Sequence, residues 1–176
     1  MKSNVALIGF MGTGKSTVGK LLAQKLKMHF TETDSLIEDL AGKPIAEIFR
    51  TQGEFGFRKL EADIITKIAD SRRTVISCGG GIVLNPSNIE QLKTNSLVVY
   101  LHAEPASILH RVLQSNEVRP LLEVEDPAKT IDDLMKFRRP LYEQSADLTV
   151  DTTDMIPEEV VSDIMAELFK NESVNF

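Results

Sequence analysis

Short apolar runs alternate along this chain with longer segments in which apolar residues recur every three or four positions. The runs predict five strands, at Val5–Ile8, His29–Glu32, Thr74–Ser77, Leu97–Leu101 and Leu148–Val150. The periodic segments predict helices at Lys15–Lys27, Ser35–Leu40, Ile45–Arg50, Glu54–Ala69, Ser87–Leu92, Ala106–Leu113, Ala128–Gln144 and Glu158–Phe169. Because strands alternate with helices, we expect an α/β fold in which a parallel sheet of five strands carries helices on both faces.

The segment Gly9–Ser16 follows the first predicted strand and matches the pattern G-x-x-x-x-G-K-S/T at every fixed position. In such a loop the backbone aims N–H groups at a phosphate, and the positive end of the next helix adds to the binding. Lys15 is expected to reach the β- and γ-phosphates of a nucleotide, and the Ser16 hydroxyl to bind Mg²⁺. The alternative is a glycine-rich turn with a chance lysine.

This motif predicts a three-layer fold of the P-loop NTPase type, with the loop at Gly9–Ser16 as its phosphate-binding element. The residues expected to contact the nucleotide are Gly12, Thr13, Gly14, Lys15, Ser16 and Thr17.

Composition limits the class of protein further. The chain has 176 residues, of which 42% are hydrophobic, enough for one folded domain over 1–176. Its net charge of −6 disfavours non-specific nucleic-acid binding. Cys78 is the only cysteine, so no intramolecular disulfide can form, and a buried thiol is expected. Since no apolar run suits a membrane span or a signal peptide, we expect a cytoplasmic protein with no membrane partner.

Residues that follow the strands are the next candidates, because parallel sheets bind ligands at the carboxyl ends of their strands. Asp34 follows the second strand, where it can cap a helix that begins at Ser35 or orient and deprotonate an attacking hydroxyl. Gly79–Gly81 follow the third strand. Three successive glycines suit either a close approach of the backbone to a ligand or another segment, or a plain flexible turn.

Three arginines can supply positive charge to a phosphoryl-transfer site. Arg58 lies in a predicted helix, Arg138 lies in a later one, and Arg119 lies in the weakly periodic segment 114–127. A guanidinium pairs bidentately with carboxylate or phosphate, and a mobile flap with an arginine suits phosphoryl transfer. The alternatives are exposed helix faces for Arg58 and Arg138, and an ordinary surface loop for 114–127.

Together, these segments resemble the shikimate kinase family over nearly the whole chain. The resemblance rests on six segments in order: G-F-M-G-T-G-K-S-T at Gly9–Thr17, Asp34, G-F-R at Gly56–Arg58, G-G-G at Gly79–Gly81, R-P-L-L at Arg119–Leu122 and R-x-P-L-Y at Arg138–Tyr142. It implies ATP-dependent phosphorylation of the 3-hydroxyl of shikimate, a step of chorismate and aromatic amino-acid biosynthesis. ATP would be the co-substrate, one Mg²⁺ ion the cofactor, and the protein a monomer.

The resemblance implies a role for each residue of the substrate side, whose main region is about 34–62. Asp34 would bind the substrate hydroxyls and act as the base. Arg58 and Arg138 would hold the substrate carboxylate, and Gly80 would contact the substrate through its backbone.

On the nucleotide side, Lys15 and Arg119 would stabilise charge on the transferring phosphoryl group, with Arg119 in a lid of about 114–127. Arg111 would stack on adenine, close to the segment Thr152–Met155. One position departs from the family, which has D-x-D where this chain has Glu32 two residues before the substrate aspartate. Because Mg²⁺ demands tight octahedral geometry, the longer glutamate is expected to make a water-mediated contact or to alter the metal affinity.

Two other functions compete with this one. A kinase of similar architecture can act on gluconate or a nucleoside monophosphate, but a pair of arginines suited to a carboxylate and the glycine triplet favour shikimate. A non-catalytic nucleotide-binding module is the other, and the combination of Lys15, Ser16, Asp34 and Arg119 favours catalysis.

Overall fold

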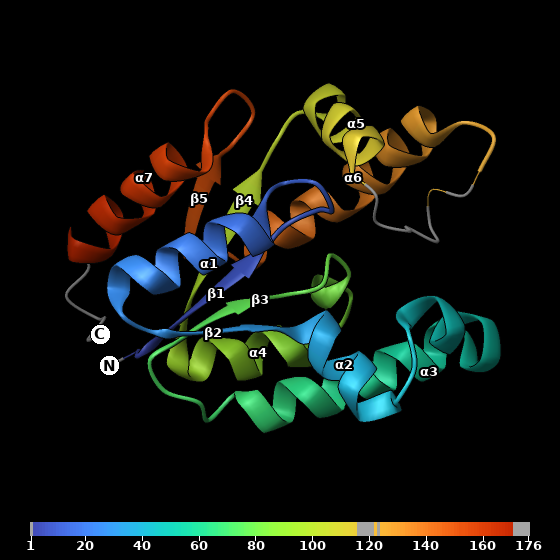
Figure 1. Ribbon diagram of the computed structural model, residues 1–176, viewed down its shortest axis with the longest axis horizontal. Helices are drawn as coiled ribbons and strands as arrows, with labels where there is room; N and C mark the ends of the chain where they lie inside the picture. The colour runs from blue at the N-terminus through green and yellow to red at the C-terminus, as the bar shows by residue number, and fades with distance from the viewer. Residues whose placement is uncertain (1, 116–121, 123, 171–176) are drawn as a thin grey trace.

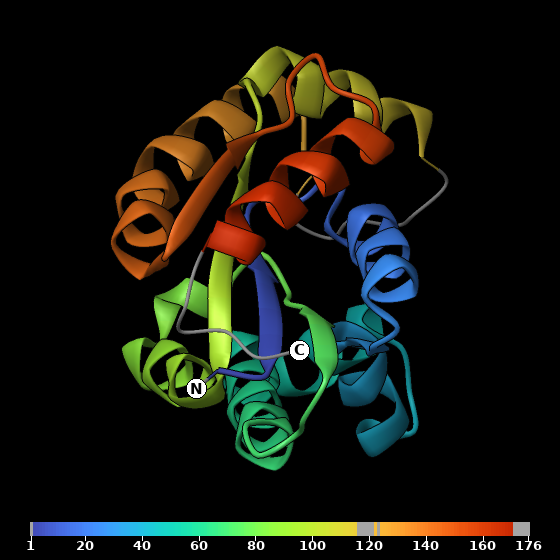
Figure 2. The same cartoon turned by 90° about the vertical axis from the view of Figure 1, so that its left-hand side faces the viewer.

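The computed structural model describes residues 2–115, 122 and 124–170. In these residues five parallel strands form one sheet in the order β2-β3-β1-β4-β5. The strands are β1 (Asn4–Ile8), β2 (His29–Glu32), β3 (Thr74–Ser77), β4 (Ser96–His102) and β5 (Leu148–Asp151). All five predicted strands are therefore confirmed, and Figure 2 shows their directions turning progressively from β3 to β5, the usual twist of a sheet.

Seven α-helices and one short 3₁₀-helix accompany these strands in the described part of the chain. They are α1 (Lys15–Leu26), α2 (Thr33–Ala41), α3 (Ile45–Ile68), η1 (Ile82–Leu84), α4 (Pro86–Asn95), α5 (Pro105–Gln114), α6 (Pro127–Ser145) and α7 (Pro157–Lys170). Four of them begin at a proline. Proline fits the first helical position because an N–H group there would have no partner within the helix, and proline has none. None of the described helices is long and apolar enough to cross a membrane.

The helices cover both faces of the sheet, as the alternation of elements predicts. Along β1, Val5 and Leu7 belong to an apolar cluster with α1 and α7, whereas Ala6 and Ile8 belong to a cluster with α3, α4 and α6. Figure 1 shows α1 and α7 together on one side of the sheet and α3 and α4 on the other. Cys78 lies in the second cluster, so its predicted burial is confirmed.

Two helices differ from the prediction in ways that concern the site. Helix α2 begins at Thr33 with Glu32 at the N-cap, so Asp34 lies inside the first turn and the capping interpretation of Asp34 is wrong. Helix α3 runs over both predicted helices of this region, but Gly53 interrupts it with φ 67° and ψ −176°. The predicted break between Ile45–Arg50 and Glu54–Ala69 is therefore confirmed as a kink at a glycine.

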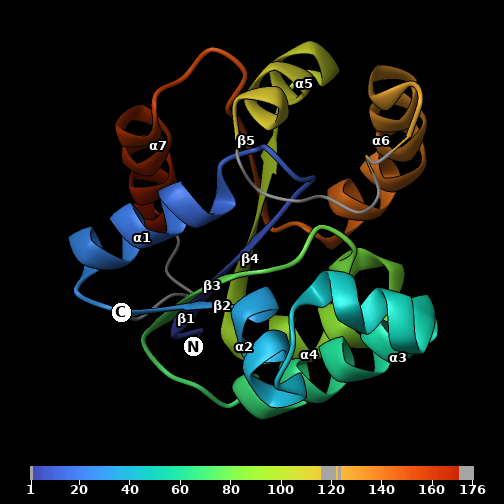
Figure 3. The ribbon, with the colours of Figure 1, turned by 45° about the vertical axis from the view of Figure 1, so that its right-hand side comes forward.

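The position of β1 at the centre of the sheet places the phosphate loop between β3 and β4. Gly9, the first residue after β1, has φ 145°, and a Cβ there would collide with the carbonyl oxygen of Leu101 on β4. Only glycine fits this position, and it lets the chain turn sharply toward α1. The turn after β3 lies between the α2–α3 pair and α6 (Figure 3), so three segments distant in sequence meet at the carboxyl edge of the sheet.

Candidate active site

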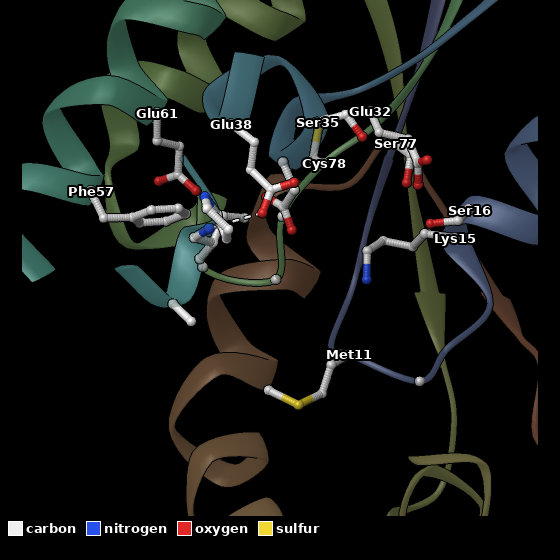
Figure 4. A pocket seen from close by; sticks show the side chains of 18 of the residues that line it. Met11, Lys15, Ser16, Glu32, Ser35, Glu38, Phe57, Glu61, Ser77 and Cys78 are labelled. Atoms are coloured by element: carbon white, nitrogen blue, oxygen red, sulfur yellow. Dashed lines mark hydrogen bonds between the residues drawn. The ribbon is translucent and has the colours of Figure 1, made fainter. Parts of the chain in front are cut away.

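A cavity of about 780 Å³ opens at this edge of the sheet. Its wall contains parts of the phosphate loop, the start of α2, both halves of α3, the glycine turn after β3, and single residues of α5 and α6 (Figure 4). Ten of the residues predicted for the site line it together: Gly12, Gly14, Lys15, Ser16, Thr17, Asp34, Arg58, Gly80, Arg111 and Arg138. Thr13 is not part of this lining, and Arg119 lies outside the described residues.

The phosphate loop is held in shape from inside. Thr13 is buried, and its hydroxyl donates to the carbonyl of Phe10 at 2.8 Å. The Lys15 ammonium donates to the same carbonyl at 2.8 Å, and Figure 4 shows its side chain directed into the cavity. Helix α1 begins at Lys15, so its first N–H groups and its positive end face the loop. This arrangement can bind the phosphates of a nucleotide.

Asp34 lies in the first turn of α2 and lines the same cavity as Lys15. The hydroxyl of Thr33 accepts a hydrogen bond from the N–H of Gly79 at 2.8 Å, which ties this turn of helix to the glycine segment. The Asp34 side chain is open to the cavity, but the protein around the carboxylate removes enough water to raise its pKa above the ordinary value. Lys15 opposes this rise, whereas the nearby carboxylate of Glu32 adds to it. A carboxylate with a raised pKa is suited to accept a proton.

Arg58 and Arg138 line the same cavity from α3 and α6. Arg58 Nη1 donates to both carboxylate oxygens of Glu61, at 3.0 and 2.9 Å, and Arg138 Nη1 lies 3.5 Å from the carbonyl oxygen of Gly80. The Nε atoms of both arginines are buried without a hydrogen-bond partner. Since both arginines line the cavity, this part of it is suited to an anionic ligand that accepts hydrogen bonds from the two guanidinium groups.

The glycines after β3 provide space for these side chains. A Cβ at Gly79 would lie 2.6 Å from Oδ1 of Asp34, and a Cβ at Gly81 would collide with the guanidinium of Arg58. Gly81 has an ordinary φ of −96°, so glycine is needed there for its lack of a side chain rather than for its backbone freedom. The interpretation that the triplet permits a close approach to another segment is thus confirmed at Gly79 and Gly81.

Arg111 connects the phosphate loop to the segment after β5. Its Nη2 donates to the carbonyls of Thr152 at 2.5 Å and Thr153 at 3.1 Å, and its Nη1 donates to the carbonyl of Gly12 at 3.3 Å. The Thr152 hydroxyl also lies 3.2 Å from the carbonyl oxygen of Thr13. The structure thus places Arg111 beside the segment where the sequence predicts the adenine, while stacking on the base stays a prediction.

Oxygen ligands gather on one side of the phosphate loop. The cavity is lined there by Ser16, Glu32 and Ser77, and Figure 4 shows all three on one side of it. Glu32 also faces Lys20, with 3.8 Å between Nζ and Oε2. Among the described residues no group of three or more His, Cys, Asp or Glu could hold a metal ion. A Mg²⁺ ion that keeps several waters and binds phosphate oxygens needs only one or two such protein ligands, so the side chains present fit it.

Sequence reasoning missed two acidic residues of this site. Glu61 is fully buried, and burial raises the pKa of its carboxyl group although Arg58 opposes the rise. Its position three residues after Arg58 on one helix is the spacing of an ion pair, and that signal could have identified it. Glu38 accepts from the N–H of Ile45 at 2.8 Å and ties α2 to the start of α3. No local pattern marks that contact.

A phosphate loop that lines one cavity of this size together with a carboxylate and two arginines defines a P-loop kinase for a small molecule. The family model for shikimate kinase matches residues 11–169. The shikimate kinase of Caldanaerobacter subterraneus subsp. tengcongensis is 46% identical over 95% of this chain and 96% of its own length. That of Thermodesulfovibrio yellowstonii is 44% identical over 93% of this chain and 94% of its own.

A solved structure agrees with these sequence relatives. The shikimate kinase from Acinetobacter baumannii, in complex with shikimate, superposes with a TM-score of 0.93 at 35% identity, and the match covers 98% of this chain and 96% of that one. The chain belongs to the shikimate kinase family.

Proposed function

We propose that this protein transfers the γ-phosphoryl group of ATP to the 3-hydroxyl of shikimate, which yields shikimate 3-phosphate and ADP. The observation that carries the proposal is that two arginines, Arg58 and Arg138, line the same cavity as Asp34 and the phosphate loop. These groups match a small anionic polyol, since the arginines can donate hydrogen bonds to its carboxylate while Asp34 accepts one from a hydroxyl. The family membership supports the same substrate over gluconate or a nucleoside monophosphate.

In this mechanism the substrate is held at both ends. Arg58 and Arg138 bind the carboxylate with charge-assisted hydrogen bonds, and the backbone of Gly80 lies between them and the phosphate loop. Asp34 then takes the proton of the 3-hydroxyl while that oxygen forms a bond to the γ-phosphorus. The bond from phosphorus to the bridging oxygen breaks, and ADP leaves with that oxygen. Alignment and electrostatics carry most of the rate enhancement.

On the nucleotide side, Lys15 would exchange the carbonyl of Phe10 for the phosphates of ATP. Arg111 would keep the phosphate loop and the segment after β5 at a constant separation, which sets the distance between the base and the phosphates. Ser16 would hold Mg²⁺ directly and Glu32 would do so through water, and the ion would neutralise charge on the phosphates. That Arg119 lies over the phosphates stays a prediction from the sequence.

The same applies to the assembly state and the compartment. A monomer is what the resemblance to the family implies. A single species near 19.6 kDa in analytical ultracentrifugation is the expected result. The cytoplasmic location and the lack of a nucleic-acid partner likewise stay predictions.

The direct test measures ADP release from Mg²⁺-ATP with shikimate, gluconate or AMP as the acceptor. Only shikimate is expected to raise the rate above the background hydrolysis of ATP. The absence of stimulation by shikimate would refute the proposal, and stimulation by gluconate or AMP alone would establish one of the rival kinases.

A further inference from the structure

Tyr142 contacts the site from behind the wall of the cavity. It lies on α6, it is 1% exposed, and its hydroxyl donates a hydrogen bond to the carbonyl oxygen of Gly80. Tyr142 follows Arg138 by four residues, so both side chains project from the same face of α6. Both reach the same carbonyl, but Arg138 does so only at 3.5 Å. The hydroxyl is thus the principal partner of the Gly80 carbonyl.

The ring of Tyr142 has little freedom to move. It stacks on Tyr100 of β4, with ring centroids 5.0 Å apart and an angle of 17° between the planes. Burial also raises the pKa of the Tyr142 hydroxyl, which keeps the phenol protonated and therefore able to donate. A donor of constant protonation on an immobile ring can hold a backbone carbonyl in one orientation.

Gly80 connects the two halves of the site. The position that a Cβ of Gly80 would occupy lies 3.5 Å from the N of Met11 and 3.6 Å from the carbonyl oxygen of Gly9, both in the phosphate loop. The carbonyl of the same residue points to α6, where Tyr142 and Arg138 meet it. A rotation of this peptide would therefore change the distance from the phosphate loop to the arginines.

We propose that Tyr142 is a positioning residue for the acceptor substrate. Its hydroxyl donates a hydrogen bond to the carbonyl of Gly80, which leaves the guanidinium of Arg138 available to the substrate carboxylate. The same hydrogen bond fixes the Gly80 peptide against the phosphate loop. Without the hydroxyl, Arg138 would be the remaining side-chain donor near this half-buried carbonyl and would be drawn toward it. The inference rests on the proposed function, since it assumes that Arg138 binds the acceptor.

The chain offers a matched control in the other tyrosine of the stack. Tyr100 is 2% exposed, and its hydroxyl lies 3.3 Å from Nδ1 of His102, away from the residues that line the cavity. Tyr142→Phe and Tyr100→Phe each remove one buried hydroxyl from the same pair of rings. Only Tyr142→Phe removes a contact with the glycine turn.

Steady-state kinetics of the two variants test the proposal. For Tyr142→Phe we expect KM for shikimate to rise about three- to tenfold, the effect of one hydrogen bond, while KM for ATP stays within about twofold. For Tyr100→Phe we expect both constants to stay within about twofold. An unchanged KM for shikimate in Tyr142→Phe, or the same rise in both variants, would overturn the proposal. Failure of the unmodified enzyme to phosphorylate shikimate would instead refute the function.

A spectroscopic measurement avoids any dependence on the folding of Tyr142→Phe. The chain has two tyrosines, so Tyr100→Phe protein labelled with [¹³Cζ]tyrosine gives a single resonance, from Tyr142. When shikimate draws Arg138 away, the Gly80 carbonyl keeps only the tyrosine as donor and that bond strengthens. We therefore expect the resonance to shift on saturation with shikimate, and gluconate at the same concentration to leave it in place. A resonance that shikimate does not move would overturn the proposal.

Discussion

Replacement of Arg58 by alanine tests whether one side chain both binds the substrate and neutralises a buried acid. Glu61 is fully buried, and its two carboxylate oxygens accept from Arg58 at 3.0 and 2.9 Å. Removal of one partner of a buried ion pair costs about 3–5 kcal/mol. Since the Arg58 side chain is 21% exposed and water already reaches the pair, we expect the lower end, about 3 kcal/mol. For a chain of this size that loss lowers Tm by about 6–12 °C.

The loss should depend on pH in a defined direction. Without the guanidinium of Arg58, burial raises the folded-state pKa of Glu61 further above its value in the unfolded chain. Such a group stabilises the fold at low pH, and this stabilisation is lost as the pH rises through the folded-state pKa. The deficit of Arg58→Ala against the parent should therefore be larger at pH 8 than at pH 5. Adding Glu61→Gln removes the charge, so the double variant should recover part of the loss and show no such dependence.

Thermal unfolding from pH 5 to pH 8 and initial rates of ADP release measure the two effects separately. We expect KM for shikimate to rise about tenfold or more, as the loss of a charged hydrogen bond predicts, while KM for ATP changes little. An equal rise for both ligands would contradict the assigned role of Arg58. A deficit in Tm that is independent of pH, with no recovery in the double variant, would show that the charge of Glu61 does not explain the stability loss.

Three further variants test other parts of the site. Asp34→Asn should lower kcat by about 10²–10⁴-fold, whereas KM for shikimate should change much less because the amide oxygen still accepts from a substrate hydroxyl. In the parent, kcat/KM should fall as the pH drops through the raised pKa of Asp34, and a variant that retains this fall would exclude Asp34 as the base. Gly81→Ala should raise KM for shikimate because its Cβ displaces the guanidinium of Arg58, and an unchanged KM would contradict that contact. Glu32→Asp should alter both the Mg²⁺ concentration at half-maximal rate and the affinity for Mg²⁺-ATP measured by calorimetry; identical values for both would remove Glu32 from the metal side.

Much of the fold was accessible from local patterns. The strands are short apolar runs. The break in α3 lies at Gly53, and in the sequence this glycine separates two segments of helical periodicity. The 3₁₀-helix Ile82–Leu84 was not predicted, because three residues after a glycine triplet carry no readable period. The early start of α2 was missed since Thr33 and Asp34 are typical capping residues, whereas here Thr33 bonds to Gly79 instead.

The sequence by itself determined the phosphate loop, since its shape depends on contiguous glycines, one lysine and the helix that follows them. It also indicated, through resemblance, which distant residues belong to the site. Only the tertiary structure decided how those residues hold one another: Arg58 on Glu61, and Tyr142 and Arg138 on the carbonyl of Gly80. The physical reason is the short range of these contacts, because a hydrogen bond forms only at about 3 Å. The order of the strands in the sheet brings α6 that close to the glycine turn.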